Sequence, residues 1–314
     1  MFAIALLTCF FVACNSTPKQ PLKIGTGLWA GYEPLYLARE LGYFGDSAIQ
    51  LVEYSAAKEV NRAFQNGAID IAGDVLQDGL FYAESDPDNR VFLLLDVSDG
   101  GDALIGQSEI KNLKDLQGST IGFDATLLSR LILVRALQSV DLQNDDINPL
   151  ALEFVEQKQA FNTKKVDALI TYEPILSALI EQGATLLFDS SEIPGEIVDV
   201  LVGHKDLENK FSKELQVLLK GWFKALDYIE NNPDDAIKRM AERQGGSQEQ
   251  FIQSLKGLSF VSLSDNQALL SGENTDLLEG AKRLSDFLKE QDLLKKEIDL
   301  NNLFDDGLVK IISP

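Results

Sequence analysis

Residues 22–44 read LKIGTGLWAGYEPLYLARELGYF and set the pattern for the chain. Leu22–Ile24 is a short apolar run that ends at a glycine, as a buried strand does. The next apolar residues, from Pro34 to Leu41, have helical spacing, with proline in the first turn and Gly42 just past the end. A strand, a glycine-rich loop and a helix in this order predict one unit of an α/β sheet.

The same alternation continues through the first two thirds of the chain. Further strands are predicted at 49–53, 69–72, 91–95, 103–106, 120–123, 152–155, 168–171, 185–188 and 198–202. Helical spacing between these runs favours a mostly parallel sheet. From about Phe211 onward the pattern is nearly all helical, with segments near 211–231, 234–243, 248–256 and 274–290.

Composition limits the class of protein. The 314 residues are 45% hydrophobic and 25% charged, which suits one large or two ordinary globular domains. No repeat or Pro/Gly/Ser linker separates two domains, so we expect the chain to pass between them more than once. A net charge of -21 repels phosphate backbones and argues against nucleic-acid binding. One histidine and two cysteines, Cys9 and Cys14, are too few for a Cys/His zinc site.

The N-terminus resembles an export signal. Residues 1–13, MFAIALLTCFFVA, are uncharged and too short to span a bilayer, which needs roughly 20 apolar residues. The end of this run followed by Cys14 resembles the lipobox of bacterial lipoproteins, which implies a lipid on Cys14 and a tether at 14–21. Phe11 stands where leucine is usual, and no basic residue precedes the apolar run. One hypothesis is that the true start codon lies upstream of Met1. A plain signal peptide and an apolar N-terminal strand are the alternatives.

A dinucleotide site is the first candidate for residues 25–30, which match G-x-G-x-x-A. Pro34 argues against it, because the helix starts too late for its N–H groups to meet a pyrophosphate. Trp29 and Tyr32 also fill the space that a phosphate needs. We instead expect Trp29, Tyr32 and Glu33 to form a pocket wall at the carboxyl edge of the sheet. Packing of both aromatic rings in the core is the alternative.

Polar turns follow several other predicted strands. Asp96–Asp102 reads DVSDGGD, and comparable stretches lie at 74–77, 124–126 and 171–174. Carboxyl ends of parallel strands share one edge of a sheet, so these turns predict a ligand site there. Solvated turns and simple helix capping are the alternatives. The acidic spacing does not match a calcium loop, and no metal is predicted.

The quoted segments resemble a known family when they are taken in order. A lipobox, residues 22–44, DVSDGGDALI and DALITYEPILSAL occur together in substrate-binding lipoproteins of ABC importers, in the nitrate, sulfonate, taurine and thiamine-precursor (SsuA/THI5-like) group. The resemblance covers about residues 22–230. It is strongest at Gly27–Phe44 and at Ala168–Pro174.

This resemblance implies a fold and a site. The fold is α/β, periplasmic-binding-protein-like of type II, with two lobes joined by two crossing strands and a helical C-terminal third. Lobe 1 would contain 22–103 and 200–314, and lobe 2 would contain 104–199, with crossings near Gly101–Leu104 and Val198–Leu201. Ligand-binding positions implied in the cleft between the lobes are Trp29, Gly31, Tyr32, Asp74, Val75, Ser98, Asp99, Thr126, Leu127, Tyr172 and Glu173.

The implied function is solute capture for an importer, without catalysis or a cofactor. The implied partners are a small-molecule ligand and an ABC permease with its ATPase; the chain would be a monomer held outside the cytoplasm by the lipid on Cys14. Oxyanion-binding members of the family place basic residues in the cleft, whereas the matching segments here offer acids and three aromatic residues. We therefore expect a cationic, zwitterionic or amine-bearing heterocyclic ligand. Arg130 could still reach into the cleft from the second turn of its predicted helix.

Two other functions stay open. An exported binding protein can dock on a membrane signalling protein instead of a permease. The thiamine-pyrimidine synthase of eukaryotes resembles this family as an enzyme, but it needs a histidine and a cysteine-rich iron motif. This chain has no cysteine after Cys14, which argues against that chemistry.

Overall fold

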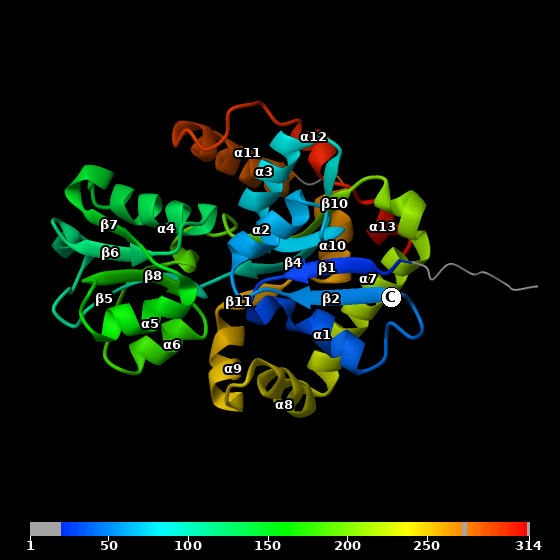
Figure 1. The fold of residues 1–314 in the computed structure, drawn as a ribbon, viewed down its shortest axis with the longest axis horizontal. Helices are drawn as coiled ribbons and strands as arrows, with labels where there is room; N and C mark the ends of the chain where they lie inside the picture. The colour runs from blue at the N-terminus through cyan, green and yellow to red at the C-terminus, as the bar shows by residue number, and fades with distance from the viewer. Residues whose placement is uncertain (1–19, 272–274, 313–314) are drawn as a thin grey trace, which may run out of the picture.

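The computed structural model describes residues 20–271 and 275–312, which form two α/β lobes (Figure 1). The predicted signal peptide, Cys14 and most of the tether lie outside the described residues. Each lobe is built on its own sheet, which confirms the predicted two-lobed α/β fold. The prediction of a mostly parallel sheet is wrong, because both sheets are mixed: each contains strands that return antiparallel to their neighbours.

The first lobe contains a sheet in the order β11-β4-β10-β3-β1-β2. Its strands are β1 (Leu22–Thr26), β2 (Ile49–Glu53), β3 (Ile71–Val75), β4 (Asn89–Ser98), β10 (Val198–His204) and β11 (Leu258–Phe260). β1 runs parallel to β2 and β3, whereas β10 is antiparallel to both β3 and β4. The central strands are almost fully buried, as continuous apolar runs such as Val91–Leu95 predict.

Helices cover both faces of the first sheet (Figure 1). The N-terminal helices are α1 (Glu33–Glu40), α2 (Ala57–Gln65) and α3 (Leu76–Ser85). The C-terminal third adds α7 (Leu207–Asn231), α8 (Pro233–Gln244), α9 (Gln248–Lys256), α10 (Leu263–Leu270), α11 (Thr275–Glu290), α12 (Leu300–Leu303) and α13 (Gly307–Lys310). The apolar stripe of α7 packs in the core, with Trp222 fully buried. Among the described helices, none combines the length and the apolar composition needed to cross a bilayer.

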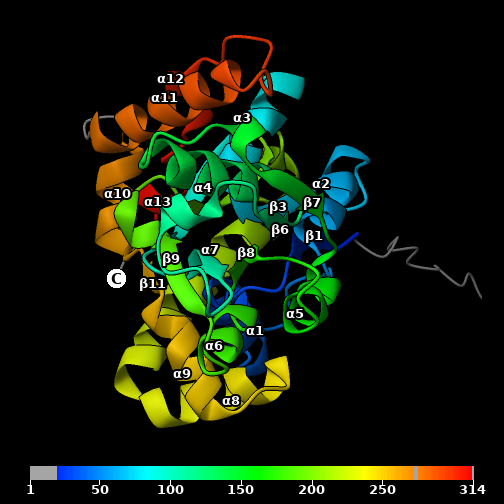
Figure 2. The same ribbon diagram turned by 90° about the vertical axis from the view of Figure 1, so that its left-hand side faces the viewer.

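The second lobe contains a sheet in the order β7-β6-β8-β5-β9, seen from its own side in Figure 2. Its strands are β5 (Asp102–Gly106), β6 (Thr120–Phe123), β7 (Asn148–Ala151), β8 (Ala168–Tyr172) and β9 (Thr185–Asp189). The helices α4 (Leu127–Gln138), α5 (Phe154–Asn162) and α6 (Ile175–Ile180) pack against it.

The chain changes sheet twice. It passes from β4 to β5 through residues 99–101, and from β9 back to β10 through residues 190–197. The two segments contact each other, because Ser190 Oγ lies 2.8 Å from Ser98 Oγ and accepts a hydrogen bond from the Gly100 N–H at 2.6 Å. Gly101 has no room for a side chain, since a Cβ there would lie 2.7 Å from the Gly257 carbonyl oxygen. The lobe boundaries at residues 103 and 199 stay a prediction.

One predicted strand is wrong. Residues 152–155 begin a helix, and the strand that was expected there is β7, which ends at Ala151. Glu153 is the N-cap of α5 and forms a capping box with Glu156. Leu152 precedes this cap and Phe154 and Val155 lie in the first turn of α5, so the apolar residues here span the start of a helix and do not form a strand. The short elements β11 and α10 were not predicted.

Candidate functional site

A cavity of about 60 Å³ lies between the lobes, where several strands of both sheets end or begin. The first lobe contributes the segment after β1, the end of β3, the first turn of α3 and the start of β10. The second lobe contributes the start of β5, the segment after β6 and the end of β8. A cavity of this size has room for more than one water, or for a small polar group of a ligand.

Six of the residues predicted for the site line this cavity together. They are Trp29, Tyr32, Asp74, Val75, Thr126 and Tyr172. They come from both lobes and from segments up to 143 residues apart, which agrees with ligand-binding turns gathered at one edge of each sheet.

The other five predicted residues lie elsewhere. Gly31 packs against Asp96, whose Oδ2 lies 2.0 Å from where a Cβ would stand. Ser98 contacts the second crossing segment, and Asp99 is exposed with its N–H bonded to the Gly257 carbonyl at 2.8 Å. Leu127 lines a neighbouring cavity.

Glu173 is buried and is not among the described residues that line the cavity. Its carboxylate accepts hydrogen bonds from Ser177 Oγ at 2.6 Å and from the Ser177 N–H at 3.2 Å. Burial raises the pKa of Glu173, while these hydrogen bonds lower it in part. Its position therefore fits the start of α6 better than contact with a ligand.

Aromatic rings form the apolar wall of the cavity. Trp29 and Tyr172 meet across the lobes in an edge-to-face arrangement with centroids 6.3 Å apart, and Tyr172 stacks on Phe154 at 4.4 Å. Trp29 also donates from Nε1 to Asp96 Oδ1 at 3.1 Å, and Tyr32 donates its hydroxyl to Asp199. Trp29 and Tyr32 are buried, with 7% and 5% of each residue's surface exposed. Both residues belong to the core and line the cavity at once, so the two sequence alternatives do not exclude each other, and a ligand contact stays a prediction.

Five carboxylates line the same small cavity: Asp74, Asp78, Asp102, Asp124 and Asp199. All except the partly buried Asp124 are buried. Asp96, also buried, lies behind them with Oδ2 unpartnered. Lysine, arginine and histidine are absent from the described residues that line the cavity. Such an excess of buried acid is costly unless the groups are protonated or meet a cation.

The register of the first sheet explains why these acids gather. On β10, Asp199 pairs with Val75 of β3 on one side and with Asp96 of β4 on the other. The residue before Val75 is Asp74, so three strands bring three carboxyl groups into one region. Sequence analysis missed Asp199 and Asp78 as site residues. The signals were a lone acid in the apolar run IVDVLV and an acid in the first turn after β3.

Burial has strong effects on the proton affinity of these groups. It raises the pKa of Asp78, Asp102 and Asp199 to about 7 in each case, and repulsion from neighbouring carboxylates adds to the rise. Burial also raises the pKa of Asp74 and Asp96 well above the ordinary value. Near neutral pH the cavity therefore holds a mixture of charged and protonated acids, and a cationic guest would favour their charged forms.

Hydrogen bonds fix the orientation of some of these carboxylates. Asp74 accepts from the Val75 N–H at 3.0 Å and from Tyr82 Oη at 2.8 Å. Asn61 donates to one oxygen of Asp78 at 2.8 Å. Because these contacts come from the protein itself, the acids are positioned before any ligand arrives.

Glu33 does not form the predicted wall. Glu33 is the first residue of α1, is fully buried and pairs with Arg243 of α8. The Arg243 Nε donates to Glu33 Oε2 at 2.6 Å. Gln244 donates to the second carboxylate oxygen at 3.0 Å. Burial raises the pKa of Glu33, and Arg243 and Gln244 only partly offset this. Glu33 is thus a structural residue that joins α1 to α8.

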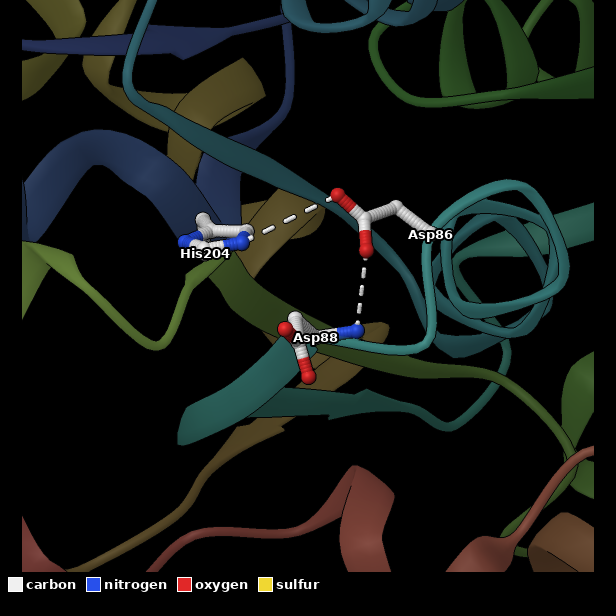
Figure 3. A group of neighbouring side chains, drawn as sticks. All are labelled: Asp86, Asp88 and His204. Carbon is white, nitrogen blue, oxygen red and sulfur yellow. Dashed lines mark hydrogen bonds and ion pairs between the residues drawn. The ribbon is translucent and has the colours of Figure 1, made fainter.

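Figure 3 shows a second polar cluster, which consists of Asp86, Asp88 and His204. It lies where β4 begins and β10 ends, at the opposite end of these strands from the cavity. His204 Nδ1 accepts the Asp206 N–H at 3.2 Å, which leaves the proton of a neutral ring on Nε2, facing Asp86 at 3.8 Å. Asp88 pairs with Lys205 at 2.8 Å. These contacts occupy the atoms that a metal would need, so we place the candidate functional site at the acidic cavity.

Two α/β lobes, two crossing segments and a cavity between strand ends define a periplasmic-binding-protein fold. Residues 29–236 match the family described as NMT1/THI5 like, and the chain belongs to this family. The putative aliphatic sulfonates-binding protein of Escherichia coli (strain K12) is 27% identical over 197 residues. That match spans 60% of this chain and 60% of the relative.

Solved structures show the same fold. A ligand-binding component of an ABC-type import system from Staphylococcus aureus, with zinc bound, has a TM-score of 0.77 at 16% identity, covering 94% of this chain and 99% of its own. The periplasmic aliphatic sulphonate-binding protein SsuA of Escherichia coli has a TM-score of 0.75 at 21% identity, covering 93% and 99%. The desulfurization enzyme DSZB has a TM-score of 0.68 at 16% identity, covering 92% and 97%. The fold thus occurs in binding proteins and in an enzyme.

Proposed function

We propose that this chain is the extracytoplasmic solute-binding component of an ABC importer, anchored by a lipid on Cys14, and that it delivers a small molecule from the cavity to a membrane permease. Membership of the NMT1/THI5-like family and the binding-protein fold support this proposal. A ligand enclosed between two lobes can signal its presence to a partner through the closed arrangement of the lobes.

The ligand is proposed to carry a positive charge into the acidic cavity. The observation that carries this step is the set of five lining carboxylates with no basic residue among the described lining residues. Relatives named for sulfonates would suggest an anion. An anion placed against these acids would meet repulsion and would raise their pKa values further, so we assign the cavity to a cationic group.

The lining residues have distinct roles in this proposal. Asp78, Asp102 and Asp199 supply the negative charge, and the faces of Trp29 and Tyr172 bound the apolar side. A cation over an aromatic face gains about 0.5–2 kcal/mol. Thr126 Oγ1 donates to Asp124 Oδ1 at 3.1 Å and so keeps that carboxylate oriented.

Amines are expected to stabilise the protein, and matched anions are not. A cation at 100 times its Kd adds about 2.7 kcal/mol, which moves the melting temperature by several degrees. The measurement is a thermal-shift series with short amines, amidines and aminopyrimidines, set against nitrate, sulfonates and carboxylates of similar size. Asp78→Asn should weaken the amine response at least tenfold in Kd. Asp145→Asn, an exposed acid of the second lobe, is the matched control. A response to anions alone would contradict the assignment.

Transport and sensing are separated in the cell. If the chain serves an importer, deleting its gene should abolish uptake of the labelled amine that binds it. Retained uptake with loss of a response to the amine would instead indicate a sensor. A binding role is preferred to an enzyme, because the relatives named for sulfonates are binding proteins.

A further inference from the structure

A second, larger cavity adjoins the acidic one. It measures about 430 Å³ and shares two lining residues with the first cavity, Asp78 and Thr126. Its walls come from α2 and α3 of the first lobe, the start of α4 in the second lobe and Leu293, just after α11. These elements approach one another between the lobes in Figure 1, and α3 contacts α4 directly.

The charge of this second cavity differs from that of the first. Arg130 of α4 and Lys58 of α2 both line it. Lys58 already pairs with Glu153 across the lobes, with both side chains about half exposed. Arg130 has no carboxylate partner within the described part of the chain, although acids outnumber bases by 49 to 28. An unpaired guanidinium is therefore the distinctive group of this cavity.

The environment of Arg130 shows unused hydrogen-bonding capacity. Its Nε is buried and has no partner among the described residues, and a terminal nitrogen of the guanidinium donates to Gln291 Oε1 at 3.3 Å. By comparison, Arg135, one turn further along α4, donates from Nε to Glu196 at 2.8 Å. A guanidinium has five N–H donors arranged to bind a carboxylate, sulfonate or phosphate in two-point fashion. Leaving a buried donor unpaired is unfavourable unless a ligand supplies the acceptor.

We propose that Arg130 binds the anionic end of a zwitterionic ligand whose cationic end occupies the acidic cavity. This inference rests on the proposed function, because it needs the acidic cavity to hold the cationic group. Asp78 and Thr126 lie where the two cavities meet, so a short chain passing them would join a small ammonium group to an acid group beside Arg130. Lys58, at the rim, adds positive potential on the same side.

The opposite signs of the two cavities explain how such a ligand would be selected. A simple amine satisfies the carboxylates but leaves Arg130 unpaired. A simple anion meets Arg130 but leaves the acids uncompensated. Only a molecule with both charges, at the spacing of the two cavities, removes both penalties, and specificity then follows from the unpaired groups left by each wrong ligand.

Calorimetric titration of a matched panel tests this inference. The probes are straight-chain ω-amino acids of two to six carbons, the corresponding monoamines and the corresponding monocarboxylates, titrated into the wild-type chain from residue 15 onward. The best zwitterion should bind at least tenfold more tightly than its monoamine. Arg130→Gln should weaken the zwitterion about tenfold to a hundredfold and change the monoamine less than twofold. Arg130→Lys should restore part of the loss, and Arg283→Gln, an exposed arginine of α11, is the control.

The possible results separate the two proposals. If monoamines bind as tightly as zwitterions and Arg130→Gln has no effect, the anion subsite is wrong and the cationic cavity stands. If monocarboxylates bind most tightly, the cationic cavity itself is wrong. If no probe of any length binds, the inference fails. It also fails if Gln291→Ala reproduces the effect of Arg130→Gln on both ligand classes, because Arg130 then has a structural role.

Discussion

Asp102→Asn is expected to stabilise the ligand-free protein at pH 8 by about 2–4 kcal/mol and to leave its stability nearly unchanged at pH 4. Burial is the main cause that raises the pKa of Asp102 from 3.8 to about 7. One pKa unit corresponds to about 1.4 kcal/mol, so the upper bound is about 4 kcal/mol. Denaturant unfolding of both proteins at several pH values measures the difference.

The direction follows from proton binding in the two states. Between about pH 4 and pH 7 the unfolded chain has released the Asp102 proton, while the folded chain still holds it. The folded state therefore binds more protons, and its stability falls as pH rises through this window. Below pH 4 the group is protonated in both states and the penalty is absent. Asparagine removes the ionisation, so the variant should gain most where the wild-type carboxylate is charged.

Removal of this charge also affects neighbouring acids. Asp102 repels Asp96 and Asp199, and it contributes to the rise in the pKa of both carboxyls. The variant should therefore lower their proton affinity as well. Asp145→Asn should stay within about 0.5 kcal/mol of wild type at every pH. If Asp102→Asn and wild type are equally stable at pH 8, the charged Asp102 carboxylate does not destabilise the folded state.

The same substitution links stability to function. If the acidic cavity binds a cation, ligand should remove the penalty in the wild type at pH 8, since an opposite charge favours the ionised carboxylates. The variant should gain less from the ligand because it has less penalty to lose. Lower stability of the folded protein without a ligand, and recovery of that stability when a cation binds, is the behaviour expected of a cation-binding site.

Local pattern was sufficient to predict most of the fold. Strands such as β2 and β6 were predicted with their correct bounds because apolar runs between turn residues are a local signal. The failure at residues 152–155 was also local, since a capping glutamate interrupts the apolar run. The absence of a linker correctly indicated that the chain passes between the lobes more than once.

The site was predicted only in part, because its chemistry depends on contacts between distant segments. Trp29 and Tyr32 follow the end of β1 and Asp74 lies at the end of β3, so the rule that ligands bind at strand ends brings all three to the cavity. Asp199 lies within a strand and enters the cavity through the pairing of β10 with β3 and β4. Nothing near it in sequence shows that register. Glu33 fails for the same reason, since Arg243 lies 210 residues further along the chain.

Arg243→Met is expected to destabilise the protein by about 3–5 kcal/mol at pH 8, because it leaves the buried Glu33 carboxylate without its cation. The Arg243 side chain is 21% exposed and that of Glu33 is 1% exposed, so solvent offers little compensation. Arg243 also lies over the Tyr36 ring at 3.9 Å and reaches Glu53 at 2.7 Å. Exposed Arg62→Met is the control and should have an effect below about 0.5 kcal/mol.

The pH dependence and a double mutant separate lost charge from lost packing. Without Arg243, the two largest interactions that lower the Glu33 pKa disappear and only the Gln244 hydrogen bond remains, so the pKa rises further and the group protonates more readily. A raised folded pKa costs stability as pH increases, so Arg243→Met should approach wild type near pH 4–5. Glu33→Gln in the same chain should recover stability at pH 8 and remove the pH dependence. If the double variant is no more stable than Arg243→Met, packing of the arginine stem accounts for the loss. Because α1 begins directly after Tyr32, loss of the Glu33–Arg243 pair should also weaken amine binding, and the double variant should recover amine affinity only to the extent that it recovers stability.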